Sequence, residues 1–275
     1  MLEQTNNKTI AKNTLFLYLR MMFTMIVTLF TSRIILQKLG IDDYGIYQAV
    51  GGVVGFLSFI NGALSTGSSR FLTYAIGERN LEKLKRTFST TLNIHILIAI
   101  IVVILAETVG LWFLYNKMVI APDRMTAAVC TYHLSILTAV FSLTQVPYNA
   151  VIIAHERMSI YAYMSIFEVS AKLGICYLLT LVDYDKLILY ASLLFIVQLL
   201  VMLFYRLYCT KNFKEARFSM TFDEIVFKEI ARFSGWSMFA NTAMALNCQG
   251  IRVLLNIFFS PAVVAARAIS LQVNM

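Results

Sequence analysis

Long apolar segments separated by short polar breaks run along almost the whole chain. The hydrocarbon core of a bilayer is about 30 Å thick and is crossed by about 20 apolar residues of α-helix, so segments of this length predict membrane-spanning helices. They are too long, and alternate too little between apolar and polar residues, for transmembrane strands. The predicted spans are Thr14–Leu36, Gly45–Ile76, Ser89–Tyr115, Met125–Ala154, Ile160–Val182, Leu187–Tyr208 and Ala231–Phe259, with a further apolar run from Ala262.

The composition agrees with a membrane protein. Of the 275 residues, 59% are hydrophobic and 14% are charged, whereas soluble domains have about 25% charged residues. The expected fold class is therefore all-α, a polytopic transmembrane helical bundle. The four cysteines lie apart in apolar runs without a CxxC or Cys/His pairing, which indicates small core residues and neither a disulfide framework nor a metal site. We expect no cofactor.

The basic residues of the breaks are divided unequally between the two sides of the predicted bundle. The net charge is +8, and in a membrane protein Lys and Arg report topology before nucleic acid is invoked as a partner. Thirteen basic residues in the breaks fall on the side of the N-terminus and four on the opposite side. This asymmetry predicts a cytoplasmic N-terminus.

The break after the sixth predicted span contains an amphipathic segment. Thr221-Phe222-Asp223-Glu224 has the form of a capping box, and apolar residues follow it at helical spacing. We expect three regions: an N-terminal six-helix bundle at 1–216, a cytoplasmic amphipathic linker helix at 217–232, and the start of a C-terminal bundle at 233–275.

The predicted C-terminal region repeats the beginning of the chain. With a shift of 219 positions, Arg33-Ile34-Ile35-Leu36-Gln37 aligns with Arg252-Val253-Leu254-Leu255-Asn256. Together with the helix count, this match suggests two parallel six-helix repeats, an architecture found among transporters. The chain stops inside the eighth apolar run. We therefore expect a C-terminally truncated fragment that holds the first six-helix half of a 6+6 transporter plus the start of the second half.

Three ionisable residues lie inside predicted spans. Ionised groups at that depth cost about 2.5–3.5 kcal/mol each, so they must pair or face water. Glu168 and Lys172 are four residues apart on one helix face, and either neutralise each other or line a cavity that binds a charged group or relays a proton. Glu107 has no basic residue within one turn, so its partner must come from another helix.

Five arginines lie inside or at the ends of the first, second, seventh and eighth predicted helices. Each can extend to the lipid headgroups, or the five together can line a cationic cavity. Guanidinium groups suit phosphate, so a pyrophosphate-bearing substrate would fit such a cavity. The residues are Arg20, Arg33, Arg70, Arg252 and Arg267.

Two predicted helices contain residues that favour bending. Gly51, Gly55 and Gly62 belong to a long span rich in small residues, which indicates either tight helix packing or a flexible helix beside a cavity. At this length the span must tilt, bend or extend beyond the bilayer. Pro147 removes a backbone donor from the fourth span and predicts a kink there, either structural or part of a mobile gate.

Several short motifs resemble those of one transporter family, whereas no enzymatic motif is visible. The segments are Leu39–Tyr47 (LGIDDYGIY), Ser69–Phe71 (SRF), Gly77–Leu84 (GERNLEKL), Pro147–Ala150 (PYNA) and His155–Met158 (HERM). They resemble Wzx-type polysaccharide flippases of the multidrug/oligosaccharidyl-lipid/polysaccharide exporter superfamily. The resemblance spans the whole chain, and its motifs are more specific to the superfamily than to this branch.

The resemblance implies two six-helix bundles around a central cavity lined by helices 1, 2, 7 and 8. It also implies a multi-pass protein of the bacterial inner membrane that translocates undecaprenyl-pyrophosphate-linked oligosaccharide by alternating access for surface polysaccharide biosynthesis. The partners so implied are the lipid-linked oligosaccharide, membrane lipids, and a polysaccharide polymerase with its chain-length machinery, and not nucleic acid.

Two alternatives remain at this point. An ion-coupled multidrug exporter of the same superfamily would need an acidic cation site in the first bundle, for which Glu107 and Glu168 are candidates, although the arginines disfavour cationic cargo. A polytopic membrane enzyme of polysaccharide assembly would need a large loop that carries catalytic residues. The predicted loops are too short for that.

Overall fold

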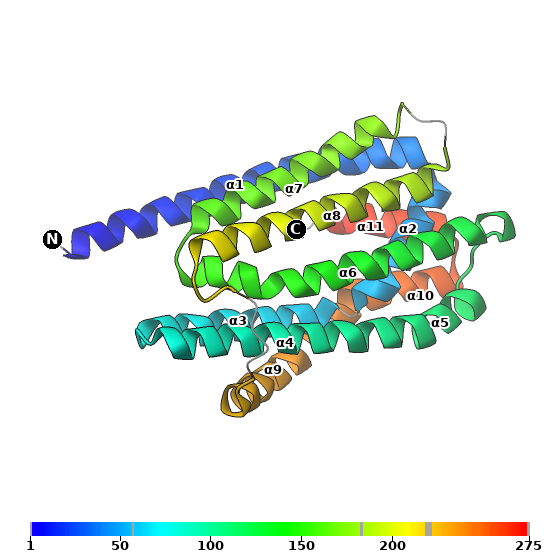
Figure 1. Ribbon diagram of the computed structural model, residues 1–275. Helices are drawn as coiled ribbons and strands as arrows, with labels where there is room; N and C mark the ends of the chain where they lie inside the picture. The colour runs from blue at the N-terminus through cyan, green and yellow to red at the C-terminus, as the bar shows by residue number, and fades with distance from the viewer. Residues whose placement is uncertain (1, 57, 182–183, 218–221, 274–275) are drawn as a thin grey trace.

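The structure, a computed structural model, describes residues 2–56, 58–181, 184–217 and 222–273. Every secondary-structure element in these ranges is helical, which confirms the predicted fold class, and most of the helices run side by side (Figure 1). The α-helices are α1 (Leu2–Leu39), α2 (Ile41–Phe56), α3 (Ser58–Gly77), α4 (Leu81–Leu105), α5 (Leu111–Lys117), α6 (Met125–Ala154), α7 (Met158–Leu178), α8 (Lys186–Asn212), α9 (Glu224–Ala245), α10 (Ile251–Phe258) and α11 (Pro261–Val273).

Short turns of other helix types join some of these helices. The π-helical turn η1 (Ala106–Gly110) links α4 to α5, η3 (Leu246–Gly250) links α9 to α10, and the 3₁₀ turn η2 (Pro122–Arg124) precedes α6. The N-terminus and the α3–α4 and α6–α7 turns lie at one end of the bundle, which we call the N-terminal end (Figure 1). The α1–α2, α5–α6, α7–α8 and α10–α11 connections lie at the opposite end, which we call the far end.

Helix α6 occupies the centre of the first bundle. It contacts α2, α3, α4, α7 and α8, while α1 packs along α7. The Tyr132 ring on α6 is fully buried, and its hydroxyl donates to the Ala106 carbonyl over 2.7 Å. This bond joins α6 to the π turn η1. Helix α6 continues through Pro147 as one helix.

The first two helices separate at a glycine in the left-handed region. Gly40 has φ +84°, and its N–H bonds to the Leu36 carbonyl over 3.1 Å, so α1 ends at Leu39. A positive φ at the residue after a helix is most easily adopted by glycine. The N-terminal end of α1 differs from the prediction, because the polar residues before Thr14 continue the helix back to Leu2.

The long span predicted at Gly45–Ile76 is divided into α2 and α3. The axes of Ile41–Gly55 and Ile60–Gly77 are bent by 51°. The predicted span is longer than a straight crossing of the bilayer requires, and the bend accommodates the extra residues. It also directs α3 toward α6 and α9, which both pack against it.

The segment from α9 to α10 has the same extent as α1. Together α9, η3 and α10 run from residue 224 to residue 258, and subtraction of 219 gives 5–39, within one turn of the bounds of α1 (Leu2–Leu39). The two segments thus have similar lengths at the predicted shift, and the internal repeat stays a prediction. The predicted boundary at residue 232 falls inside α9, so residues 224–232 are the first part of a longer helix. Asp223 caps that helix by accepting from the Ile225 and Val226 amides, whereas Thr221 lies outside the described residues.

Helices α10 and α11 pack against the first two helices at the far end. A Cβ added to Gly45 on α2 would lie 2.1 Å from the Pro261 carbonyl oxygen on α11, so only glycine allows this approach. The Asn256 side chain on α10 is fully buried, and its Oδ1 accepts from the Val119 amide over 3.1 Å. These contacts fix α10 and α11 to the first bundle.

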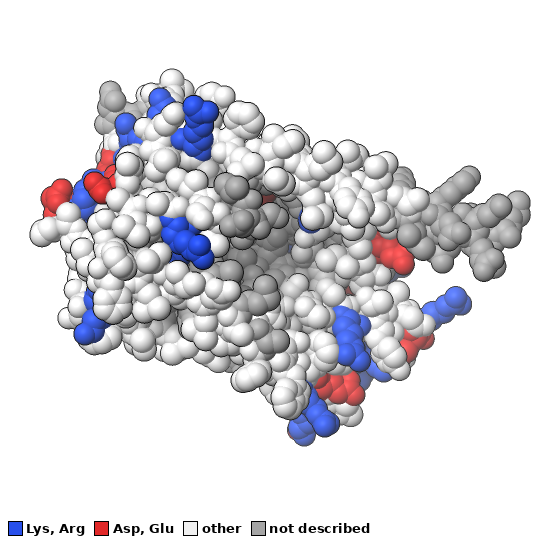
Figure 2. Space-filling model, turned by 180° about the vertical axis from the view of Figure 1, so that it is seen from behind, with Lys and Arg blue, Asp and Glu red and all other residues white. Residues whose placement is uncertain are grey.

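The apolar helices fit a multi-pass membrane protein. Four segments of the described chain are long and apolar enough to cross a membrane, and the bent pair α2–α3 would add a fifth. Helix α7 is also long enough, but Glu168 and Lys172 lower its hydropathy. On the face shown in Figure 2, the charged side chains gather toward the two ends of the molecule and leave the middle largely uncharged.

Candidate functional site

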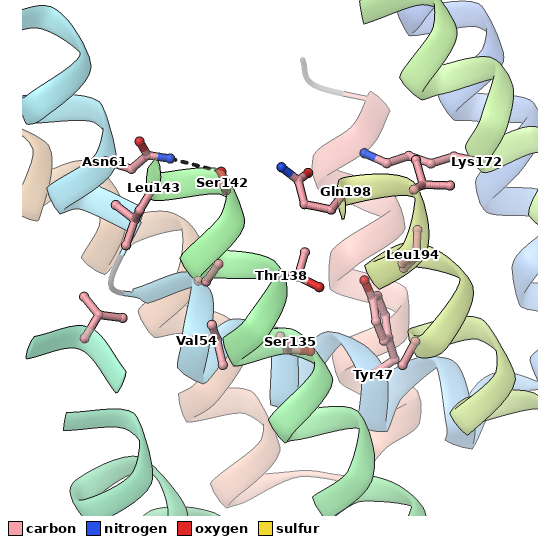
Figure 3. Close-up of a pocket in the computed structure, with 16 residues that line it drawn as sticks. Tyr47, Val54, Asn61, Ser135, Thr138, Ser142, Leu143, Lys172, Leu194 and Gln198 are labelled. Atoms are coloured by element: carbon pink, nitrogen blue, oxygen red, sulfur yellow. Dashed lines mark hydrogen bonds between the residues drawn. The ribbon is translucent and has the colours of Figure 1, made fainter. Parts of the chain in front are cut away.

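An interior cavity of about 320 Å³ lies within the first bundle. It is bordered by α2, α3, α4, α6, α7 and α8 (Figure 3). Its apolar wall includes Val54, Val102, Leu143 and Leu194. Its polar lining consists of Tyr47, Asn61, Ser135, Thr138, Ser142, Lys172 and Gln198.

A polar stripe on α6 extends from this cavity toward the N-terminal end. Ser135, Thr138, Ser142, Gln145 and Asn149 recur at intervals of three and four, which places them on one helix face. A second cavity of about 300 Å³ is lined by the part of this stripe nearer the N-terminal end (Ser142, Gln145 and Asn149) and by residues of α3. Asn61 and Ser142 belong to both cavities, so the polar lining is continuous between them.

Amide side chains hold this lining together and leave acceptors unused. The Gln198 Nε2 donates to Gln145 Oε1 over 2.9 Å, and the Asn61 Nδ2 donates to Ser142 Oγ over 3.4 Å. The Oδ1 atoms of Asn61 and Asn149 are buried and have no hydrogen-bond partner within the described ranges. A buried acceptor without a partner is costly, so a ligand hydroxyl or water is expected there.

One charged side chain reaches into the cavity. Lys172 extends from α7 toward the space beside Gln198 (Figure 3). Its Nζ lies 2.6 Å from Glu168 Oε1, one turn earlier on α7. Glu168 does not line either cavity. As far as the linings are described, the first cavity has one charged lining residue, Lys172, and the second has none.

Glu107 receives its partner from another helix. Its Oε1 lies 3.0 Å from His133 Nδ1 on α6, and both side chains are about two-fifths exposed. Neither residue lines the interior cavity. Glu107 is thus placed on an outer face of the bundle, in the π turn η1.

The five predicted arginines lie at separate places. The guanidinium of Arg20 lies 4.6 Å from the centre of the Tyr161 ring, and that of Arg70 lies 4.7 Å from the centre of the Phe233 ring. Arg252 donates to Gln249 Oε1 over 3.1 Å. Arg33 is exposed, and Arg267 is partly buried. None of the five lines the interior cavity. The cationic cavity predicted between two bundles stays a prediction.

The predicted glycines bring α2 and α3 close to the second repeat. A Cβ on Gly62 would lie 3.0 Å from Asn241 Oδ1 on α9, and one on Gly55 would lie 3.2 Å from the Gln249 side chain on η3. Gly51 and Gly55 also border the interior cavity. Gly55 and Gly62 thus serve close helix packing beside the cavity, and their role in flexibility stays a prediction.

Most of the cavity lining was not among the residues predicted from the sequence. Tyr47, Ser135, Thr138, Ser142 and Gln198 were not selected, because single hydroxyls and amides in apolar helices are common. The regular spacing of polar residues along α6 was the signal that could have identified one wall. The pairing of that wall with α3 and α8 depends on the tertiary fold.

Comparisons with known proteins identify the family. The MatE family model matches residues 16–178, more than half of the chain. No curated protein sequence matches significantly. Among solved structures, a multidrug resistance MATE family transporter of the MOP superfamily in an inward-facing conformation has a TM-score of 0.69 at 14% identity, covering 92% of this chain and 60% of that one.

Two further structures give the same result. A MOP superfamily transporter from Pyrococcus furiosus, described as having a binding pocket of reverse polarity, has a TM-score of 0.66 at 13% identity and covers 86% of this chain and 53% of its own. A MATE protein in complex with MaD3S has a TM-score of 0.62 at 14% identity and covers 96% and 66%. The chain therefore spans between half and two thirds of the length of these transporters, whose fold it shares. It belongs to the MatE family.

Proposed function

We propose that this chain takes part in the transport of a lipid-linked oligosaccharide across the bacterial inner membrane, with its N-terminus in the cytoplasm. The observation that carries this proposal is the chemistry of the interior cavity. Its described lining offers hydroxyls, amides and the Lys172 ammonium, and it contains no carboxylate. Such a lining suits an anionic, polyhydroxylated cargo better than a cationic drug.

Each group of the lining has a matching group on such a cargo. Sugar hydroxyls both donate and accept, so they can pair with the Asn61 and Asn149 Oδ1 atoms that lack partners. A phosphate can bind the Lys172 ammonium, which Glu168 holds at the cavity wall. The apolar part of the wall contacts the faces of the sugar rings. The cargo's lipid tail would stay in the bilayer while its head group moves by alternating access.

An ion-coupled multidrug exporter is the second candidate, and one feature favours it. The Glu168 carboxylate lies one helical turn from the cavity and is neutralised by Lys172 alone among the described residues. Movement of Lys172 would leave an acidic group available to a cation. Glu107 supports this candidate less well, because it is paired with His133 outside the cavity.

Substitutions at the ion pair separate the two candidates. In cells whose chromosomal gene carries the change, Glu168→Gln leaves Lys172 charged, whereas the double change Glu168→Gln with Lys172→Gln removes both charges without leaving a carboxylate exposed. The measurements are surface polysaccharide, accumulation of lipid-linked oligosaccharide on the cytoplasmic side, and sensitivity to cationic drugs.

We expect Glu168→Gln to retain surface polysaccharide and the double variant to lose most of it, with drug sensitivity unchanged in both. Retention of polysaccharide in the double variant would contradict the proposal. Raised sensitivity to cationic drugs in the Glu168→Gln cells, with normal polysaccharide, would establish the exporter instead. Immunoblots of membrane fractions control for protein level.

A further inference from the structure

A third cavity, of a different character, lies at the N-terminal end of the molecule. It has a volume of about 1000 Å³ and lies between the end of α3, the beginning of α4 and the first half of α9. We call it the α3–α9 cleft. Its charged lining residues are Arg70, Glu78, Lys83, Glu229 and Arg232. Its aromatic ones are Phe71, Tyr74, Phe233 and Trp236.

The charges of the cleft leave one positive charge in excess. Lys83 and Glu78 neutralise each other, with 2.7 Å between Nζ and Oε2. The remaining charged residues are Arg70, Arg232 and Glu229, which sum to +1. No carboxylate of the described chain lies within 4.0 Å of either arginine. Both guanidinium groups are therefore available to an anion.

One of the two arginine side chains, that of Arg70, has a defined position in the cleft. The Arg70 guanidinium lies over the Phe233 ring, 4.7 Å from its centre, and a cation stacked on an aromatic ring is held in place while its edge stays open to hydrogen-bond acceptors. Phe233 itself packs edge-on against Phe71. The cleft thus presents a positioned guanidinium rather than a mobile surface charge.

Exposed aromatic residues indicate where the cleft lies in a membrane. Trp236 is 77% exposed and Tyr74 is 66% exposed. Phe239, one turn after Trp236 on α9, is 80% exposed. Trp and Tyr are enriched at the level of the lipid headgroups. Large apolar side chains beyond that level on the same helix contact acyl chains.

We propose that the α3–α9 cleft binds the headgroup of an anionic phospholipid. One phosphodiester charge matches the excess charge of the cleft, the two guanidinium groups donate to its oxygens, and the acyl chains follow the exposed surface of α9 beyond Trp236. Because α9 begins the second repeat and α3 belongs to the first, a bound lipid would bridge the two repeats at the N-terminal end. This proposal is independent of the identity of the transported cargo.

Tryptophan fluorescence provides a direct test, because the chain contains two tryptophans, Trp112 and Trp236. In the variant Trp112→Phe, Trp236 is the single reporter. The protein is reconstituted in phosphatidylcholine vesicles that contain a small fraction of brominated phosphatidylglycerol, or the same fraction of brominated phosphatidylcholine. We expect stronger quenching by phosphatidylglycerol. The relative association constant should fall about fivefold for each arginine removed.

Matched variants make the result specific. Arg70→Gln with Arg232→Gln should abolish the preference for phosphatidylglycerol, whereas Arg70→Lys with Arg232→Lys should retain part of it, since the charge is kept. Arg86→Gln with Arg157→Gln removes two exposed charges that do not line the cleft, and should leave the preference unchanged. Equal quenching by the two lipids would overturn the proposal. Loss of quenching on addition of inorganic phosphate would also overturn it, and would assign the cleft to a soluble phosphate.

Discussion

The two ends of the first bundle are fastened by different electrostatic contacts. At the far end, the guanidinium of Arg124 joins three connections. Its Nε and one terminal nitrogen donate to Asp43 over 2.9 and 2.5 Å, and its other terminal nitrogen donates to Asp185 over 2.7 Å. Asp185 also caps α8 by accepting from the Leu187 and Ile188 amides. We call this set of three residues the far-end clamp.

At the N-terminal end, a single histidine and a single carboxylate fasten two segments. The Nε2 of His155, in the α6–α7 turn, donates to Glu215 Oε1 over 2.5 Å. The ring of Phe213 stacks on His155 with centres 4.3 Å apart. Glu215 is buried, 4% exposed, and lies in the segment that leads from α8 toward α9. We call His155, Phe213 and Glu215 the N-terminal-end contact.

The difference indicates which end of the bundle is more rigid. The far-end clamp shares one permanent charge between two carboxylates and closes three connections at once. The N-terminal-end contact joins only two segments, through one histidine and one carboxylate. The far end, where α10 and α11 also pack against the first bundle, is therefore expected to be the more rigid of the two.

The largest expected effect comes from the far-end clamp. Arg124→Gln leaves Asp43 and Asp185, both less than one-third exposed, without their common partner. Loss of one member of a largely buried ionic network destabilises by about 3 kcal/mol. Arg124→Lys should show a smaller loss of stability, because an ammonium keeps the charge but does not reproduce the forked geometry. The measurement is thermal unfolding in detergent. The exposed Arg79→Gln serves as the matched control, and an equal melting temperature in Arg124→Gln and Arg79→Gln would remove the distinction between the ends.

The next effect is expected at the N-terminal-end contact. Burial raises the pKa of Glu215, but the hydrogen bond and charge of His155 outweigh this, so its pKa is lowered from the ordinary value of 4.5. A carboxylate with a depressed folded pKa contributes stability above its unfolded pKa, and this contribution is lost as the pH falls through the folded pKa. Wild-type protein should thus lose more stability than Glu215→Gln when the pH is lowered below about 4.5.

At neutral pH, Glu215→Gln should destabilise the protein by about 2 kcal/mol, since a charge-assisted hydrogen bond is replaced by a neutral one. The readout is the difference in melting temperature between wild type and variant, followed from pH 7 downward. A constant difference over the whole range would show that Glu215 is not ionised in the folded state. The Asp185 pKa is also lowered, mainly by Arg124 and the α8 amides against the effect of burial, so Asp185→Asn is the corresponding variant at the far end.

The sequence predicted the fold because the main signal is local. The length of each apolar run predicts a membrane-spanning helical segment, although the first helix ends at Leu39 and not at the predicted Leu36. The position of the bend between α2 and α3 and the π turn η1 were not predictable. The π turn, for example, is contacted by Tyr132, whose hydroxyl donates to the Ala106 carbonyl 26 residues away. The helix start at Leu2 was missed because the residues that continue α1 before Thr14 are mostly polar.

The candidate site likewise contains contacts that helix geometry predicts and contacts that depend on the tertiary fold. Glu168 and Lys172 lie one turn apart on one helix, so their proximity followed from helix geometry. Gln145 and Gln198 meet across 53 positions, and Asn61 and Ser142 across 81. Such pairs depend on which helices become neighbours, which a single sequence does not specify. The five arginines were grouped because they lie inside or at the ends of the first, second, seventh and eighth predicted helices, and that placement does not specify which side chains meet.

The smallest effect is expected at an exposed ion pair on α9, which sets the baseline for the comparison. Lys228 Nζ lies 2.7 Å from Glu224 Oε1, and both side chains are more than 70% exposed. Exposed pairs at this spacing contribute less than about 0.5 kcal/mol, so Lys228→Gln should leave the melting temperature nearly unchanged. A large loss of stability in Lys228→Gln would mean that α9 is covered at this position. In that case, the stability lost in the Arg124 and Glu215 variants would be explained by the burial of these contacts. The number of segments that each contact joins would then not be the cause.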